Sequence, residues 1–122
     1  MRYQRVMKKI NSNVIGIDQG EETLFSDFEN GGDMWTGEGS RERRATVRFS
    51  ERFREPPNVM VSVSLWDVDY STNIRADVEA ESISKGQFEI VFRTWGNTRM
   101  ARARVSWMAI GAVDDEDHWD IP

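Results

Sequence analysis

The chain has 122 residues, which is enough for one domain with a single hydrophobic core, and it contains no cysteine. Without cysteine, disulfides and thiolate metal sites are excluded. The formal net charge of -5 argues against nonspecific binding of nucleic acid, because the phosphate backbone attracts basic proteins.

Residues 1–12 form a basic segment, with Arg2, Arg5, Lys8 and Lys9, that lacks the apolar core of a secretory signal. We therefore expect synthesis in the cytoplasm without a standard export signal, which leaves non-classical release or association with a particle open. Apolar runs elsewhere are too short for a membrane span, so no membrane insertion is expected.

Residues 13–112 show apolar residues that alternate with a period of two, and this spacing predicts strands. An opening strand is predicted over 13–17. The later rows are Ala45, Val47 and Phe49; Val59, Val61, Val63 and Leu65; Ala76, Val78 and Ala80; Phe88, Ile90 and Phe92; and Ala103, Val105, Trp107 and Ala109. Together they predict an all-β fold, a six-stranded antiparallel β-sandwich.

A long loop is predicted over residues 20–40, which are rich in glycine and polar side chains. Loops of this length in a small domain are usually functional or disordered. Large apolar side chains such as Phe28 and Trp35 indicate that this one packs against the domain.

The residues around Lys85 predict a tight hairpin turn, and that turn sets the register of the strands on either side. Arg75 then lies opposite Trp95, and Asp77 lies opposite Arg93. Opposed residues share a face of the sheet, and the Phe88 row fills the core face. We therefore expect Trp95 to point away from the core with Arg75 beside it.

A second hairpin is predicted at residues 96–99, which would pair Arg93 with Arg102 and Trp95 with Met100. This register places Arg102 and Arg104 on the same outward face as Arg93. The expected face carries Arg75, Arg93, Arg102 and Arg104 beside Asp77, Glu79 and Glu81. Such a face is either a set of solvated ion pairs or an interface between subunits, and both interpretations stay open.

Trp95 and Arg75 are the residues that suggest a ligand. An indole can stack on a sugar ring while a guanidinium donates to its hydroxyls. The alternative is that the arginine stem simply packs across the tryptophan. A nucleophilic triad is not expected, because there is no cysteine and the only histidine, His118, lies near the C-terminus. The chain is therefore not predicted to be an enzyme.

Residues 113–122 form an acidic tail that begins with Val113 and includes Asp114 to Asp117, His118, Trp119 and Ile121. The simpler interpretation is a solvated tail that folds back on its own domain. The alternative is a docking peptide for a protein partner or a neighbouring subunit. Neither this cluster nor Asp67 with Asp69 is assigned as a metal site, and the latter pair is expected to serve the following turn.

An ordered set of short pieces along the chain resembles the H-type lectin domain, the family of the snail agglutinin and of the discoidin C-terminal domain. The pieces are Ile17-Asp18-Gln19-Gly20, Phe53-Arg54-Glu55-Pro56-Pro57-Asn58-Val59, Asp67-Val68-Asp69, Asn73-Ile74-Arg75, Gly86-Gln87-Phe88, Thr94-Trp95-Gly96-Asn97-Thr98 and Val105-Ser106-Trp107-Met108-Ala109-Ile110-Gly111. The resemblance implies a β-sandwich that assembles as a trimer or a pair of trimers. It also implies binding of galactose or N-acetylgalactosamine in shallow sites between protomers, without catalysis or a cofactor.

The resemblance also implies roles for particular residues. The family's arginine and stacking tryptophan match Arg75 and Trp95, and its loop aspartate matches Glu38. The family's sugar-binding histidine falls on Gly96, and an aromatic residue falls on Ala101. The candidate sugar-binding residues are Trp95, Arg75, Glu38, Gly96 and Asn97.

Two functions of different classes follow. The first is a lectin module that recognises glycans on a surface polysaccharide or glycoconjugate, with weak single sites strengthened by multivalency. The second is a structural or assembly protein that uses the same trimeric sandwich in a bacterial appendage or a phage-like particle, without binding sugar.

Overall fold

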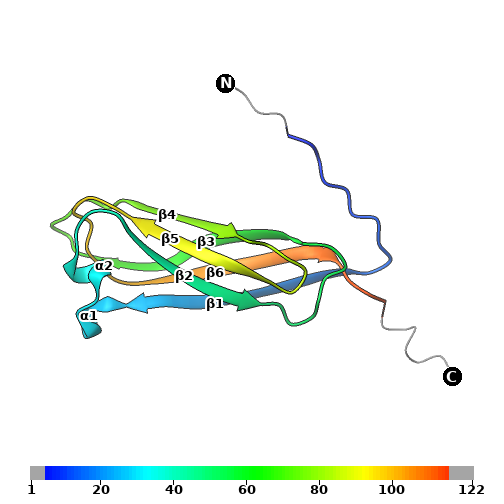
Figure 1. The fold of residues 1–122 in the computed structure, drawn as a ribbon, viewed down its shortest axis with the longest axis horizontal. Helices are drawn as coiled ribbons and strands as arrows, with labels where there is room; N and C mark the ends of the chain where they lie inside the picture. The colour runs from blue at the N-terminus through cyan, green and yellow to red at the C-terminus, as the bar shows by residue number, and fades with distance from the viewer. Residues whose placement is uncertain (1–4, 116–122) are drawn as a thin grey trace.

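The computed structural model describes residues 5–115 (Figure 1). The expected acidic tail is therefore described only as far as Asp115, and His118 and Trp119 lie outside the described residues. The elements are β1 (Ile15–Ser26), α1 (Asp27–Asn30), α2 (Asp33–Thr36), β2 (Arg41–Arg48), β3 (Asn58–Val68), β4 (Ala76–Glu81), β5 (Gln87–Thr94) and β6 (Met100–Ala112).

Across these residues, six strands form two antiparallel three-stranded sheets, in the orders β1-β6-β3 and β2-β5-β4. The sheets stack on each other along their length, with α1 and α2 at one end and the start of β1 at the other (Figure 1). The predicted six-stranded antiparallel β-sandwich is confirmed. Neither short helix approaches the length or apolar character that crossing a membrane requires, within the residues described.

The core lies between the two sheets and uses the alternate residues of the sequence pattern. The fully buried apolar side chains of the two central strands include Phe88, Ile90, Phe92, Ala103, Val105 and Ala109. The Phe88 ring stacks on Phe49 at 5.6 Å between centroids and meets Trp107 edge to face at 5.5 Å. Each large side chain buried in this way contributes roughly 1.5–3 kcal/mol.

The first strand is longer than predicted, because it extends to Ser26 rather than ending at Ile17. Its half-buried positions include Asp18 and Gly20, so the apolar alternation that marks a strand is missing there. Gly20 faces the indole of Trp107, and a Cβ at this position would lie 3.1 Å from that ring. Gly20 of β1 leaves room for the Trp107 ring of β6. Because glycine is common in loops, its presence made this segment resemble a loop.

The prediction that β5 and β6 form a hairpin is wrong. β5 pairs with β2 and β4 in one sheet, whereas β6 pairs with β1 and β3 in the other. The turn at residues 96–99 therefore crosses from one sheet to the other, so Arg93 does not pair with Arg102. Both arrangements satisfy the alternation of the core residues, which is why the pattern could not separate them. The register between β4 and β5 is confirmed, with Asp77 opposite Arg93.

Candidate functional site

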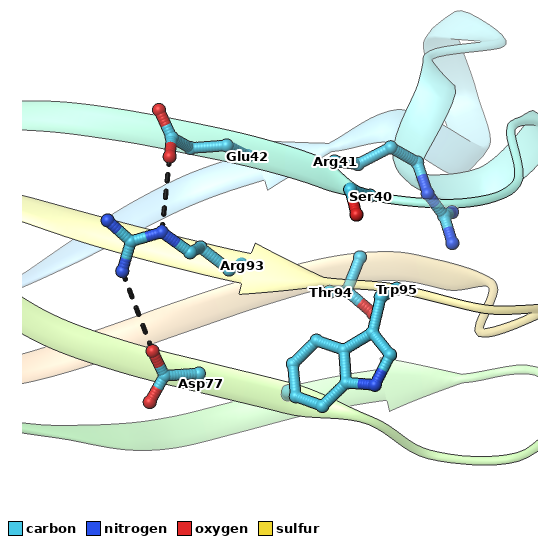
Figure 2. A pocket seen from close by; sticks show the side chains of 8 residues that line it. Ser40, Arg41, Glu42, Asp77, Arg93, Thr94 and Trp95 are labelled. Atoms are coloured by element: carbon cyan, nitrogen blue, oxygen red, sulfur yellow. Dashed lines mark hydrogen bonds and ion pairs between the residues drawn. The ribbon is translucent and has the colours of Figure 1, made fainter.

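A groove of about 610 Å³ lies at one end of the β2-β5-β4 sheet (Figure 2). It is the end nearest to α1 and α2 (Figure 1). Strand ends and the loop before β2 supply its walls. The lining residues are Ser40, Arg41, Glu42, Ala76, Asp77, Arg93, Thr94 and Trp95. The indole of Trp95 borders this groove and is 41% exposed, in agreement with the sequence-based register.

Two buried threonines fix the backbone around Trp95. The hydroxyl of Thr94 donates to the carbonyl oxygen of Arg75 at 2.5 Å. The hydroxyl of Thr98 accepts from the Arg75 N–H at 3.0 Å and donates to the carbonyl of Asn73 at 2.7 Å. Because both threonines are almost fully buried, these bonds hold the lead-in to β4 against the turn after β5.

The Arg75 side chain lies over Gly96, the residue that follows Trp95. A Cβ built on Gly96 would be 3.6 Å from both Cδ and Nε of Arg75. Gly96 has φ 71°, a left-handed conformation that favours glycine. The structure therefore brings Arg75, Trp95 and Gly96 together, and it places the arginine stem against the glycine.

The loop before β2 docks on the same turn. The N–H of Gly39 donates to the carbonyl of Gly96 at 2.9 Å, and Arg41 Nη2 donates to that carbonyl at 3.2 Å. Glu38 is exposed and directly precedes Gly39, the residue that contacts Gly96. Asn97 has a structural contact, because its side-chain oxygen accepts from the N–H of Asn73 at 3.4 Å.

Arg41 is a site residue that sequence reasoning missed. It is only 7% exposed, and its guanidinium also donates to the backbone carbonyls of Gly39 and Asp33 at 2.9 and 3.2 Å. Figure 2 shows its side chain turned away from Arg93, toward the loop. A signal was present, since Arg41 falls in the inward row that continues with Ala45 and Val47.

The floor of the groove is a network of charges on the outer face of the β2-β5-β4 sheet. Arg93 binds Glu81 at 2.8 Å and Glu42 at 3.2 Å, and it also binds Glu79. The hydrogen bonds that Arg93 donates, to Glu81 first and then to Glu79, raise the pKa of Arg93 above its ordinary value. Arg93 is therefore committed to protein carboxylates. Arg75 is exposed and lies over Gly96, next to Trp95 in the chain, but neither it nor Glu38, Gly96 or Asn97 lines the groove itself.

A buried ion pair supports the helical end of the molecule. Asp27 is 4% exposed, and its carboxylate accepts two hydrogen bonds from Arg43, at 3.0 and 2.6 Å. The N–H of Met34 donates to the same carboxylate at 2.9 Å. Burial raises the pKa of Asp27, but the bonds from Arg43 and Met34 together outweigh it, so the pKa lies below its usual value.

The expected single arginine face is wrong in one respect, because Arg102 and Arg104 belong to the other sheet. Arg102 lies 3.3 Å from Asp67, and Arg104 lies 2.9 Å from Glu21. Ala101 is buried and does not line the groove beside Trp95. The separation follows from the crossing of the chain between sheets after β5.

The two aspartates of the β3 end have structural partners. Asp67 faces Arg102, and Asp69 accepts from the N–H and the hydroxyl of Ser71 at 2.9 and 2.7 Å. Asp69 therefore caps the turn that follows it. Over residues 5–115, no group of three or more metal-ligating side chains is arranged around a common centre.

Comparison with known proteins defines the class. The H-type lectin domain model matches residues 44–110, and the chain belongs to this family. Together, the family and the fold make it a lectin-type module.

A relative in Fuscovulum blasticum carries the name "ATP synthase subunits region ORF 7". It is 52% identical over 107 residues, which cover 88% of this chain and 93% of the relative.

Two solved structures of discoidin II from Dictyostelium discoideum share the fold. The recombinant protein matches with a TM-score of 0.69 and 21% identity, over 88% of this chain and 41% of its own. The wild-type protein matches with a TM-score of 0.68 and 22% identity, over 83% and 38%. This chain thus spans about two fifths of the discoidin II chain.

Proposed function

We propose that the chain binds glycans, of the galactose or N-acetylgalactosamine type, in the groove beside Trp95. The exposed indole of Trp95, fixed by buried Thr94 and flanked by the Arg75 side chain on Gly96, is the observation that carries the proposal. The indole face packs on the C–H face of a pyranose, and the guanidinium donates to its hydroxyls. Glu38, beside Gly39 on the docked loop, accepts from a further hydroxyl.

Affinity for one sugar is expected to be weak. Gly96 offers no side chain to a ligand, and a groove at a sheet end buries only part of a pyranose. Effective binding of a cell surface or polysaccharide then depends on several sites acting together. The same reasoning makes oligomerisation part of the function.

The test is a glycan array with a matched pair of variants. Trp95→Ala should lower binding of galactose-type glycans by roughly tenfold or more, because the stacking surface is lost. Trp66→Ala, which removes a tryptophan that is 50% exposed on β3, should leave that binding unchanged. Equal binding by Trp95→Ala and the unaltered chain would place the sugar elsewhere. If the unaltered chain binds no glycan, the glycan proposal fails and the fold stands.

We also propose that copies associate, as a trimer or a pair of trimers, through the outer face of the β1-β6-β3 sheet. Ile17 on β1 is 64% exposed and Met60 on β3 is 71% exposed, and neighbouring Ile15, Met108 and Ile110 extend the same apolar patch. Uncovered apolar patches on a sheet mark interaction surfaces.

The opposite outer face is less suited to self-association. There the carboxylates Glu42, Asp77, Glu79, Glu81 and Glu89 outnumber the guanidiniums Arg44, Arg48 and Arg93. Two copies of that face would repel each other.

The apolar patch also supports the second function, a structural building block that assembles without sugar. The array and a mass measurement in solution separate the two functions. An oligomer that binds no glycan would be an assembly module, whereas an oligomer that loses galactose-type glycans on Trp95→Ala would be a lectin.

A further inference from the structure

A second groove, of about 470 Å³, lies on the other sheet and shares no residue with the groove beside Trp95. Its floor is a cross-strand row at the helical end of the β1-β6-β3 sheet, in which Ser26, Arg102 and Asp67 are neighbours. Its walls come from the two short helices. The full lining is Ser26, Phe28, Glu29, Trp35, Asp67, Val68, Ala101 and Arg102.

The wall is a supported aromatic platform. The Phe28 ring is 61% exposed and meets Trp35 edge to face, with 5.1 Å between centroids. Trp35 is held from behind, because the Arg99 guanidinium lies 5.0 Å from the centre of its ring and Arg99 Nε donates to its carbonyl at 2.8 Å. Phe28 is thus an exposed aromatic ring beside a tryptophan that Arg99 holds in place, and the pair forms one apolar wall of the groove.

The floor carries polar side chains whose contacts are exposed to solvent. Arg102 Nε lies 3.3 Å from Asp67, and their side chains are 54% and 53% exposed. An ion pair this exposed contributes little to folding, so both groups can exchange partners with a ligand. Glu29 adds a second exposed carboxylate at the rim.

We propose that this groove is a second saccharide-binding site. One pyranose ring packs its C–H face on Phe28, and its hydroxyls donate to Asp67 and Glu29 while accepting from Arg102. Asp67 and Glu29 disfavour an anionic ligand, and the mixture of carboxylate acceptors with the Arg102 donor matches hydroxyl groups, which both donate and accept. A purely apolar ligand would leave the Arg102–Asp67 pair desolvated without a partner.

The site has a consequence for the whole loop between β1 and β2. Its first part, with Phe28 and Trp35, lines this groove, and its last residue, Ser40, lines the groove beside Trp95. One chain therefore offers two sugar sites at the same end of the sandwich, on opposite sheets. The proposed association patch lies on the same outer face but farther along the sheet, with Met108, its nearest member on β6, roughly 20 Å from Arg102.

The test follows tryptophan indole N–H signals by two-dimensional ¹⁵N NMR on the full chain. Methyl galactoside, methyl N-acetylgalactosaminide, methyl glucoside and methyl mannoside are each titrated to about 50 mM, where even a millimolar site is occupied. The Trp35 and Trp95 signals, assigned with single Trp→Phe variants, report the two grooves separately. The Trp107 signal, from the core, reports that each variant is folded.

At least one sugar is expected to shift the Trp35 signal, and that shift should persist in Trp95→Ala. The sugar affinity that the Trp35 titration reports should fall roughly tenfold in Phe28→Ala and in Asp67→Asn. The second site is excluded if no sugar moves Trp35, or if the Trp35 shift disappears in Trp95→Ala. A Trp35 response without any Trp95 response would support this site while rejecting the proposed groove beside Trp95.

Discussion

Gly96 is the residue that joins the parts of the groove beside Trp95, because its carbonyl receives Gly39 and Arg41 while Arg75 lies over its Cα. Its φ of 71° is costly for any residue with a Cβ. Gly96→Ala should therefore lower the free energy of unfolding by about 1 kcal/mol, although a methyl group would meet Arg75 only at ordinary contact distance.

Denaturant unfolding measures this effect, with Gly86→Ala as the control. Gly86 has no positive φ, and its added Cβ would lie 3.5 Å from Arg52 Nη1. That change should be neutral or slightly stabilising. Equal effects of the two variants would show that the backbone of Gly96 carries no strain for a side chain.

At the residue scale, sequence patterning could predict the exposure of Trp95 and the register that places Asp77 opposite Arg93. Both depend only on alternation around a tight turn. Alternation does place Arg41 in the inward row of Ala45 and Val47, but one sequence does not show that backbone carbonyls satisfy its guanidinium there. Only the folded structure shows that the carbonyls of Gly39 and Gly96 point at the Arg41 guanidinium and accept its hydrogen bonds.

At the scale of elements, the α1 and α2 segment depends on the ion pair between Asp27 and Arg43. Asp27→Asn removes the charge while keeping the shape. It should lower the free energy of unfolding by roughly 2–3 kcal/mol at neutral pH, less than for a fully buried pair, because Arg43 is partly exposed.

The contribution of Asp27 to the free energy of unfolding depends on pH with a definite sign. The pKa of Asp27 is lower in the folded chain than in the unfolded chain, where an aspartate titrates near about 3.9. Its stabilisation is therefore complete at pH values above the unfolded pKa, and it is lost as the pH falls through the folded pKa. The free energies of unfolding of the wild type and of Asp27→Asn should differ at about pH 6 and converge as the pH falls through the folded pKa of Asp27. A difference that stays constant with pH would contradict the role of the charge.

The elements also show where alternation stops being informative. The length of β1 was hidden because Asp18 and Gly20 occupy inward positions that a strand usually fills with apolar residues. The crossing after β5 was hidden because a hairpin and a crossing give the same pattern of inward residues on β6. Only long-range pairing, which depends on how the two sheets close on each other, decides between them.

At the scale of the whole molecule, the two outer faces differ in character, and this difference is the basis of the proposed association of copies. Apolar side chains on neighbouring strands are paired across the β1-β6-β3 sheet, with Ile17 beside Ile110 and Met60 beside Met108. Burying such a face contributes roughly 25 cal/mol per Å² of apolar surface. The charges elsewhere on this face are balanced, since Arg102 and Arg104 pair with Asp67 and Glu21.

The double variant Ile17→Glu with Met60→Glu should therefore convert the oligomer to a monomer, because two carboxylates would be buried without partners at every contact. Light scattering or native mass measurement reads the outcome directly, and far-ultraviolet circular dichroism confirms that the sandwich is retained. Thr46→Glu, on the exposed outer face of β2, is the matched control and should leave the oligomer intact.

On a glycan array the monomer should lose roughly 10²-fold or more in apparent affinity through lost multivalency. Its affinity for a free sugar should change little, because Trp95, Arg75 and Gly96 come from one chain. An oligomer that survives both glutamates would move the association surface to the acidic sheet, where the carboxylates around Arg93 would then have to be neutralised by the neighbouring copy.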